Sequence, residues 1–175
     1  EICRGDRPLE IDLGCGDGRL TIEAAGWARR VYAIDRSAAV LQRARALATK
    51  HGARNIVWKR GEIERVPLPA ASVDVALLSQ ALHHAADPGV ALAEAVRVLR
   101  PGGRALLLDL RPHDQAWVKE RLGDHWLGFS DDALASLMRR AGLRDIRLTL
   151  GARKAGGPFT VTIASGVKGR ARAGA

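Results

Sequence analysis

Short apolar runs alternate with helix-like segments along most of the chain. Seven runs rich in aliphatic and β-branched residues, each bounded by turn residues, predict strands at residues 9–13, 31–35, 56–60, 73–78, 104–110, 146–150 and 159–164. Between these runs, apolar residues recur at the three- and four-residue spacing of an amphipathic helix. Strands that alternate with helices predict an α/β fold, in which a mostly parallel sheet is covered by helices on both faces.

Three helices are predicted from apolar faces and from the residues that bracket them. The faces fall in the segments 40–48, 92–99 and 134–141. Ser37, Asp87 and Ser130 precede these segments, and their side chains are suited to accept hydrogen bonds from the free N–H groups of a first helical turn. The RPGG sequence at 100–103 ends the second helix. These start and stop signals support the alternation of strands and helices.

Three glycines at alternate positions, Gly14, Gly16 and Gly18, follow the first predicted strand in the sequence LGCGDG. Glycine permits left-handed turns and close approach of a ligand to the backbone, and the helix that follows offers free N–H groups. The spacing differs from the dinucleotide fingerprint, because Arg19 stands where its third glycine would be. A bound nucleoside is one interpretation of this loop, and a plain tight turn is the other.

Acidic and polar residues follow the next strands. Asp35 ends the second strand, 17 residues after Gly18, where a carboxylate can accept both hydroxyls of a ribose. A helix-capping or surface aspartate is the alternative. Glu62 and Ile63 follow the third strand, and a carboxylate beside a backbone N–H can recognise adenine. Ser79 ends the fourth strand. Four strand ends therefore converge on one adenosine-bearing ligand.

Four segments carry a family resemblance. IDLGCGDGRL, VYAIDRSAAVLQRAR, GEIERVPLPAASVDVALLSQALHHAADP and VLRPGGRALLLDL stand in the order and spacing of the class I S-adenosylmethionine-dependent methyltransferases, and most resemble the ubiquinone/menaquinone-methyltransferase-like branch. The match covers residues 9–110. Beyond it, the segment from HDQAWVKERLGDHWLGFSDDAL onward resembles the methyltransferase halves of fusions with an ArsR-type repressor. The family implies a Rossmann-like, seven-stranded sheet of order 3-2-1-4-5-7-6 with the last strand antiparallel.

The resemblance implies that S-adenosyl-L-methionine is the cofactor. The cofactor-binding residues that it implies follow the first four strands and are Asp12, Gly14, Cys15, Gly16, Gly18, Asp35, Arg36, Gly61, Glu62, Ile63 and Ser79. The glycine loop would surround the methionine and ribose, Asp35 would bind the ribose hydroxyls, and Glu62 would bind adenine. Glu62 departs from the aspartate that is commoner in the family. Cys15 is interpreted as a small packing residue rather than a nucleophile.

Methyl transfer from a sulfonium needs alignment of the acceptor and, for some acceptors, removal of a proton. The candidate proton acceptors are His83, His84, Asp109 and His113, and of these His84 and His113 are predicted to be catalytic. A histidine between a strand and a helix also commonly satisfies a buried backbone group. The aromatic segment 117–129 is expected to form the substrate wall, with ordinary packing against the sheet as the alternative.

Composition narrows the possible partners. The 175 residues fit one domain, expected at 1–165, followed by a basic and flexible tail at 166–175. Two cysteines are too few for a disulfide framework or a structural zinc site, so no metal is expected. The net charge of +9 comes from dispersed arginines, and aromatic residues are only 4%, which argues against nucleic acid binding by this domain. No apolar stretch is long enough to span a membrane, which predicts a cytoplasmic protein.

A small organic methyl acceptor is the favoured substrate class. The sequence SQAL at 79–82 does not suit a flipped base, and two cysteines do not suffice for arsenite. Two other functions stay open: a module that senses S-adenosylmethionine or S-adenosylhomocysteine for a repressor, and a nicotinamide-dependent oxidoreductase.

Because the first strand begins about eight residues from Glu1, we expect that a preceding domain or a second copy of the chain closes the pocket.

Overall fold

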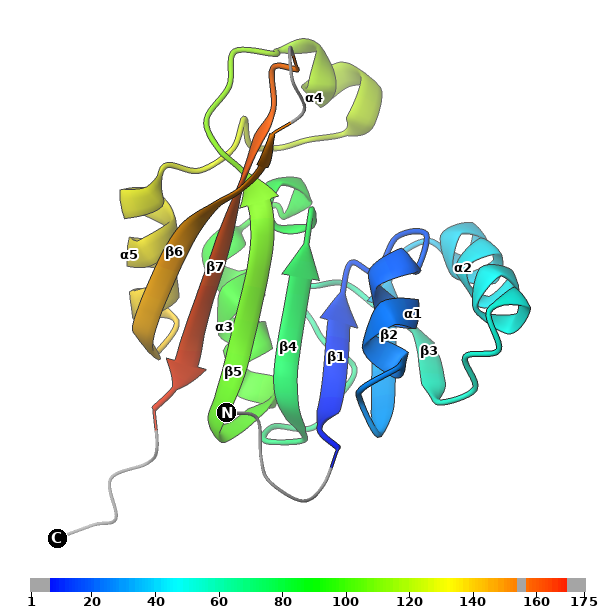
Figure 1. Ribbon diagram of the computed structural model, residues 1–175. Helices are drawn as coiled ribbons and strands as arrows, with labels where there is room; N and C mark the ends of the chain where they lie inside the picture. The colour runs from blue at the N-terminus through cyan, green and yellow to red at the C-terminus, as the bar shows by residue number, and fades with distance from the viewer. Residues whose placement is uncertain (1–6, 154–156, 170–175) are drawn as a thin grey trace, which may run out of the picture.

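A computed structural model describes residues 7–153 and 157–169 of the chain. Its seven strands form one sheet in the order β3-β2-β1-β4-β5-β7-β6 (Figure 1). The strands are β1 (Leu9–Leu13), β2 (Arg30–Asp35), β3 (Ile56–Arg60), β4 (Val73–Ser79), β5 (Leu99–Leu110), β6 (Leu143–Arg153) and β7 (Thr160–Lys168). Only β7 runs antiparallel to its neighbours, β5 and β6. The predicted α/β class, strand order and antiparallel last strand are confirmed.

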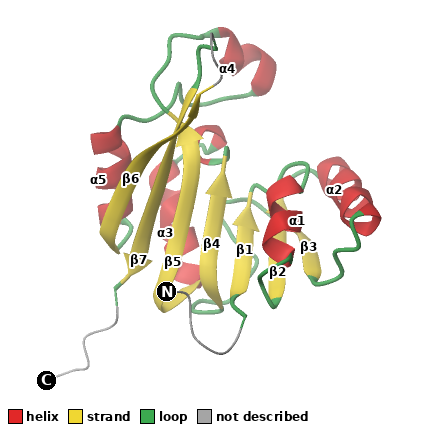
Figure 2. Cartoon of the chain, in the orientation of Figure 1, coloured by secondary structure: helices red, strands yellow, loops and turns green. Residues whose placement is uncertain are grey.

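Helices cover both faces of the sheet (Figure 2). They are α1 (Arg19–Ala25), α2 (Ala38–Lys50), the short 3-10 helix η1 (Leu82–His84), α3 (Pro88–Val98), α4 (Trp117–Leu122) and α5 (Asp131–Arg140). The predicted N-caps are confirmed, because the side chains of Ser37, Asp87 and Ser130 each accept a hydrogen bond from the first turn of the following helix. The helices α1 and α2 lie on one face, and α3 and α5 lie on the other.

The main apolar core lies between the sheet and the pair α3 and α5. Ile11 and Leu13 of β1, Leu92 of α3 and Met138 of α5 are all fully buried there. Burying side chains of this size contributes about 1.5–3 kcal/mol each. The core therefore fixes β1 and β4, whose carboxyl ends point toward α4 in Figure 1, and with them the loops that follow these strands.

Three strands are longer than the sequence predicts. β5 begins at Leu99, directly after α3, and pairs there with Val73 before a bulge, so RPGG lies inside the strand. β6 and β7 extend as an antiparallel pair in which polar residues mask the apolar alternation. β7 reaches Lys168, beyond the domain boundary expected at residue 165, and the Lys168 Nζ donates to the Leu99 carbonyl at 2.6 Å. Residues 170–175 of the expected tail lie outside the described residues.

None of the helices in the described part of the chain is long and apolar enough to cross a membrane.

Candidate functional site

A cavity of about 710 Å3 opens at the carboxyl ends of β1 to β4. Predicted site residues that line it are Gly14, Gly16, Asp35, Arg36, Gly61, Glu62, Ile63 and His84. The rest of the lining consists of Glu64, Arg65, Gln80, Ala81, Ala86, Asp87, Val90, Leu122 and His125. Open parallel sheets bind ligands at this end of their strands. The cavity thus lies where the sequence places the nucleoside.

The three glycines of the loop after β1 meet different surroundings. All have positive φ angles, 73° at Gly14, 52° at Gly16 and 80° at Gly18. A Cβ on Gly14 would lie 2.7 Å from the Cβ of Ala81, and one on Gly18 would lie 3.0 Å from the Cβ of Ala44. A Cβ on Gly16 would meet nothing within 4 Å, although Gly16 lines the cavity. Gly14 and Gly18 therefore serve packing, and Gly16 keeps the ligand space open.

Asp35, the last residue of β2, is held at the cavity by two backbone hydrogen bonds. The Gly16 N–H donates to its Oδ2 at 3.1 Å, and the Ser37 N–H donates to its Oδ1 at 2.9 Å. A carboxylate has about four acceptor sites, so each oxygen retains capacity for a further donor. The carboxylate is fixed in place and can still accept the two hydroxyls of a ribose.

The loop after β3 forms the next wall of the cavity. The Gly61 N–H donates to the Asp35 carbonyl at 3.1 Å, which ties this loop to the end of β2. Ile63 lies against the glycine loop, with its Cγ2 at 3.8 Å from the Cβ position of Gly14. The Glu64 Oε1 accepts the Ala86 N–H at 2.8 Å and so joins this loop to the one after β4. The pair Glu62 and Ile63 is thereby fixed on the rim.

Two carboxyl groups of β1 are buried behind the glycine loop. The Asp12 Oδ2 accepts a hydrogen bond from the Thr21 hydroxyl of α1, and burial raises the Asp12 pKa to about 6. Glu10 lies two residues earlier on the same face of β1, is fully buried, and neither of its oxygens has a hydrogen-bond partner among the described residues. Burial, and next the charge of Asp12, raise the Glu10 pKa to about 8. No role for Glu10 was predicted from the sequence.

The other predicted cofactor residues do not line the cavity. Cys15 is buried beside Ala33 and Leu41, and burial strongly raises the pKa of its thiol, which suits a packing residue. Ser79 is the last residue of β4, directly before Gln80, whose φ of 52° turns the chain into the cavity wall. Asp12 lies behind the glycine loop, and Gly18 ends that loop, where it packs against Ala44.

The far side of the cavity is formed by the region around α4. His84, Leu122 and His125 line it, whereas His113 does not. His113 instead packs edge-on against Phe159, with ring centroids 4.9 Å apart. Burial, and next the charge of His83, lower the His84 pKa, so its imidazole is neutral at neutral pH.

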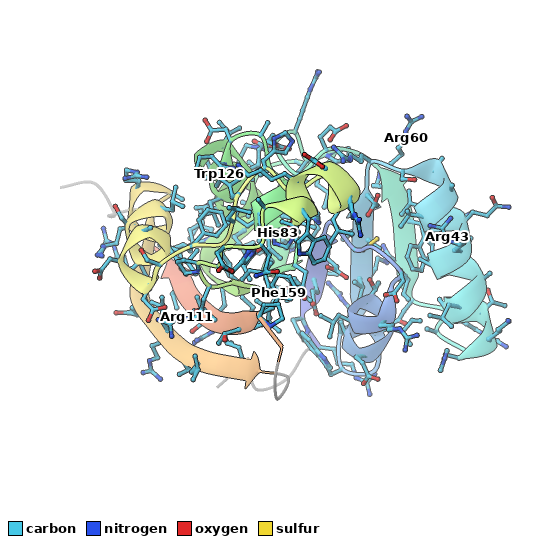
Figure 3. All side chains as sticks on the ribbon, turned by 90° about the horizontal axis from the view of Figure 1, so that it is seen from above. Arg43, Arg60, His83, Arg111, Trp126 and Phe159 are labelled. Atoms are coloured by element: carbon cyan, nitrogen blue, oxygen red, sulfur yellow. The ribbon has the colours of Figure 1, made fainter. Side chains whose placement is uncertain are left out.

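The aromatic rings of segment 117–129 lie outside this cavity. Trp117 packs against Phe159, the Trp126 indole N–H donates to the Ala85 carbonyl at 2.9 Å, and Phe129 is buried in the core. Figure 3 looks down on this end of the sheet, with His83 between the labelled Trp126 and Phe159. Leu122 and His125 are the residues of this segment that line the cavity, whereas Trp126 and Phe129 line a neighbouring hollow that shares Ala86 and Asp87 with it. The substrate wall stays a prediction.

Comparison with known proteins decides the family. The family model described as "Methyltransferase domain" matches residues 11–107, which is more than half of the chain. The chain belongs to this methyltransferase family. The cofactor of this family is S-adenosyl-L-methionine. The matched residues contain the glycine loop, Asp35, Glu62 and η1, so the methyltransferase domain includes most of the cavity.

Curated relatives include methyltransferases of quinone compounds. The domain is 35% identical over 138 residues to the ubiquinone/menaquinone biosynthesis C-methyltransferase of Rubrivivax gelatinosus, covering 73% of this chain and 53% of that protein. It is 38% identical over 115 residues to the 2-phytyl-1,4-naphtoquinone methyltransferase of Synechococcus elongatus, covering 62% of this chain and 48% of that protein. The chain spans about half the length of these two relatives.

A solved structure shares the fold of the methyltransferase domain. The YcgJ protein of Bacillus subtilis superimposes with a TM-score of 0.76 at 18% identity, covering 97% of this chain and 95% of that chain. Because the identity is low, the likeness concerns the fold alone.

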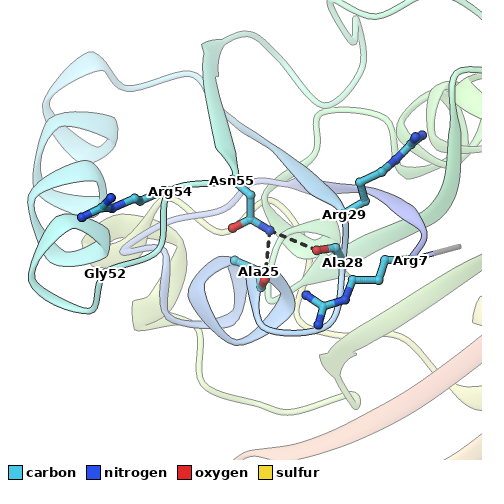
Figure 4. Close-up of a pocket in the computed structure, with 7 residues that line it drawn as sticks. All are labelled: Arg7, Ala25, Ala28, Arg29, Gly52, Arg54 and Asn55. Atoms are coloured by element: carbon cyan, nitrogen blue, oxygen red, sulfur yellow. Dashed lines mark hydrogen bonds between the residues drawn. The ribbon is translucent and has the colours of Figure 1, made fainter.

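A second hollow lies at the opposite end of the strands of the methyltransferase domain (Figure 4). Arg7, Arg29 and Arg54 border it, and the Asn55 side chain donates to the carbonyls of Ala25 and Ala28 at 2.9 and 3.0 Å. The three arginines come just before the amino ends of β1, β2 and β3. Cofactors of such sheets bind at the carboxyl ends, so this basic hollow is separate from the cofactor site.

Proposed function

We propose that the chain binds S-adenosyl-L-methionine in the cavity at the ends of β1 to β4 and transfers its methyl group to a small organic acceptor. The observation that carries this proposal is the fixed Asp35 carboxylate beside Gly16, which has free space where a side chain would be. Glu62 and Ile63 line the same cavity from the loop after β3. Asp35 would hold the ribose, and Glu62 with the backbone of Ile63 would hold adenine. When bound, the cofactor supplies an activated methyl group.

The chain's own part in the reaction is alignment and exclusion of water. Leu122, His84 and His125 close the side of the cavity opposite the adenine rim. Holding an acceptor in line with the methyl group removes much of the entropic barrier. Val90 and Ala86 add apolar lining to the cavity, which suits a small apolar or amphipathic acceptor. The quinone compounds named for the two relatives agree with this class.

Asp35→Ala is expected to weaken binding of S-adenosylmethionine and S-adenosylhomocysteine by about 1–3 kcal/mol, or roughly 5- to 150-fold, because the ribose hydroxyls lose their charged acceptor. Asp17→Ala is the matched control, since Asp17 is an exposed carboxylate of the same loop that pairs only with Arg19. Calorimetric titration measures both variants, with thermal unfolding as a check that they fold. Equal affinities for Asp35→Ala and the parent chain would overturn the assignment of this pocket.

Of the two candidate histidines, we propose that His84 acts on the acceptor. His84→Gln is expected to lower turnover at least tenfold, since a group that assists proton removal typically contributes about 100-fold or more. His113→Gln is expected to stay within about twofold of the parent chain, because His113 packs against Phe159 away from the cavity. Turnover of labelled S-adenosylmethionine with a verified acceptor decides this. A loss in His113→Gln that exceeds the loss in His84→Gln would contradict it.

The resemblance to repressor fusions and the cytoplasmic location stay predictions. A module that only senses S-adenosylmethionine would bind it as tightly as an enzyme and would form no methylated product. Product detection across small hydroxyl, amine and quinol acceptors therefore separates the enzyme from the sensor.

A further inference from the structure

Two histidines and an aspartate that are far apart in the sequence meet at the edge of the cavity. His83 and His84 belong to η1, and Asp124 follows α4. The rings of the histidines are 4.2 Å apart, and one ligand atom of each of the three residues lies within 4.8 Å of the others. His83 and Asp124 are buried, while His84 lines the cavity. The three side chains therefore converge at a protected point that opens toward the cavity.

The orientation of His83 is fixed by Asp109 at the end of β5. The Asp109 carboxylate accepts the N–H groups of Leu82 at 2.9 Å and Leu110 at 2.7 Å, and its Oδ1 lies 2.7 Å from the His83 Nδ1. A carboxylate oxygen can only accept, so the His83 Nδ1–H donates to Asp109, and in the neutral ring Nε2 carries the lone pair. This carboxylate–imidazole arrangement is the one that orients histidine ligands of metal ions.

The free ring nitrogen of His83 faces a second carboxylate. Its Nε2 lies 3.9 Å from the Asp124 Oδ2, and the Asp124 Oδ1 lies 3.4 Å from the His84 Nδ1. Both separations exceed the 2.7 Å of the hydrogen bond between His83 and Asp109. The His84 Nδ1 also lies 3.5 Å from the Gly123 carbonyl, so every group that faces these ring nitrogens is a hydrogen-bond acceptor, and a proton or a metal ion must lie between them. The geometry is that of a cation site.

We propose that His83, His84 and Asp124 bind one divalent first-row transition-metal ion of the zinc type, with Asp109 as the residue that positions His83. Around a tetrahedral Zn2+ with bonds of about 2.0–2.1 Å, neighbouring ligand atoms are about 3.4 Å apart. The 3.4 Å between the Asp124 Oδ1 and the His84 Nδ1 equals this value, and the 3.9 Å between the other Asp124 oxygen, Oδ2, and the His83 Nε2 is about 0.5 Å longer. Two imidazole nitrogens and one carboxylate select zinc, cobalt or nickel over magnesium and calcium.

Three protein ligands leave a coordination position that faces the cavity. Such open positions are typical of catalytic rather than structural sites. If the chain transfers methyl groups as proposed above, the ion would hold an oxygen atom of the acceptor, and His84 would act on the acceptor through it. This role rests on the proposed function, whereas metal binding itself does not. No metal was expected from the sequence, because the chain has only two cysteines and Asp124 lies in a different loop from the histidines.

Cobalt titration tests the proposal without cofactor or acceptor. The chain is first stripped of metal with a chelator, and it carries Cys3→Ser to remove a competing thiol. It is expected to bind one equivalent of Co2+ and to show the visible d–d absorption bands that are typical of a low coordination number. Zn2+ should displace it, and Mg2+ and Ca2+ should not. His84→Ala and Asp124→Asn should each weaken binding about 100-fold or more, and Asp109→Asn about 10- to 100-fold, as for other groups that orient ligands.

His51→Ala is the matched control, because His51 is an exposed histidine at the end of α2 and should leave binding unchanged. Thermal unfolding checks that each variant is folded. Failure to bind Co2+, or equal binding by the parent, His84→Ala and Asp124→Asn, would overturn the proposal. A doubly protonated His83 ring at neutral pH, seen by NMR in the metal-free and the metal-treated chain alike, would show that a proton holds the place of the ion. None of these outcomes depends on methyl transfer, so the two proposals fail separately.

Discussion

Glu10→Gln is expected to stabilise the fold by about 2–4 kcal/mol at pH 9 and to leave its stability nearly unchanged at pH 4. The Glu10 pKa is about 8 in the folded chain, against 4.5 for an exposed glutamate. Between these values the folded state binds more protons than the unfolded state, so the stability of the parent chain falls as pH rises from about 4.5 to 8. Glutamine imitates the protonated carboxyl and carries no such penalty.

Urea unfolding at pH 5, 7 and 9 measures this effect. The free energy of unfolding of Glu10→Gln should exceed that of the parent by an amount that grows with pH and levels off above pH 8. Glu23→Gln is the control, because Glu23 is an exposed glutamate of α1 and its replacement should shift stability by less than about 0.5 kcal/mol at each pH. A constant difference between Glu10→Gln and the parent across the three pH values would contradict the burial of an uncharged Glu10.

Gly14→Ala is expected to destabilise the fold by about 2–5 kcal/mol. A left-handed backbone costs an alanine about 1–2 kcal/mol, and its methyl group would lie 2.7 Å from the Ala81 side chain, an overlap that costs a further 1–3 kcal/mol. Gly16→Ala shares the left-handed backbone and has free space around the new methyl group, so its cost should be about 1–2 kcal/mol.

Gly14→Ala and Gly16→Ala should also differ in their effect on the affinity for the cofactor. The methyl group of Gly16→Ala enters the cavity, so this variant should lose affinity for S-adenosylmethionine while it remains folded. Urea unfolding and calorimetry on the same samples make the comparison. Equal destabilisation by both substitutions would mean that Gly14 is required only for its backbone angle and not for packing against Ala81.

The sequence was sufficient to predict the fold because its start and stop signals are local. Ser37, Asp87 and Ser130 cap the helices as predicted, since a cap depends on residues only two or three positions away. The lengths of β6 and β7 were underestimated, because polar residues are acceptable in antiparallel strands with one face toward solvent and hide the apolar alternation.

The parts of the candidate site that lie at strand ends were predicted from the sequence. The parts that form where distant segments meet were missed. Asp35 ends β2, and Glu62 and Ile63 come within three residues of the end of β3, so their position was predictable. Leu122 and Asp124 reach the site through the loop around α4, and no local pattern marks that contact. For Glu10 a signal existed, because a charged residue stood inside the apolar run LEIDL.

The central claim is that the cavity at the ends of β1 to β4 is built for S-adenosylmethionine. Calorimetric titration of the parent chain with S-adenosylmethionine, S-adenosylhomocysteine and NAD tests it most directly. The account predicts that the first two ligands bind with one site per chain and that NAD gives no binding heat. Tighter binding of NAD than of S-adenosylmethionine, or no binding of either adenosyl ligand, would contradict it.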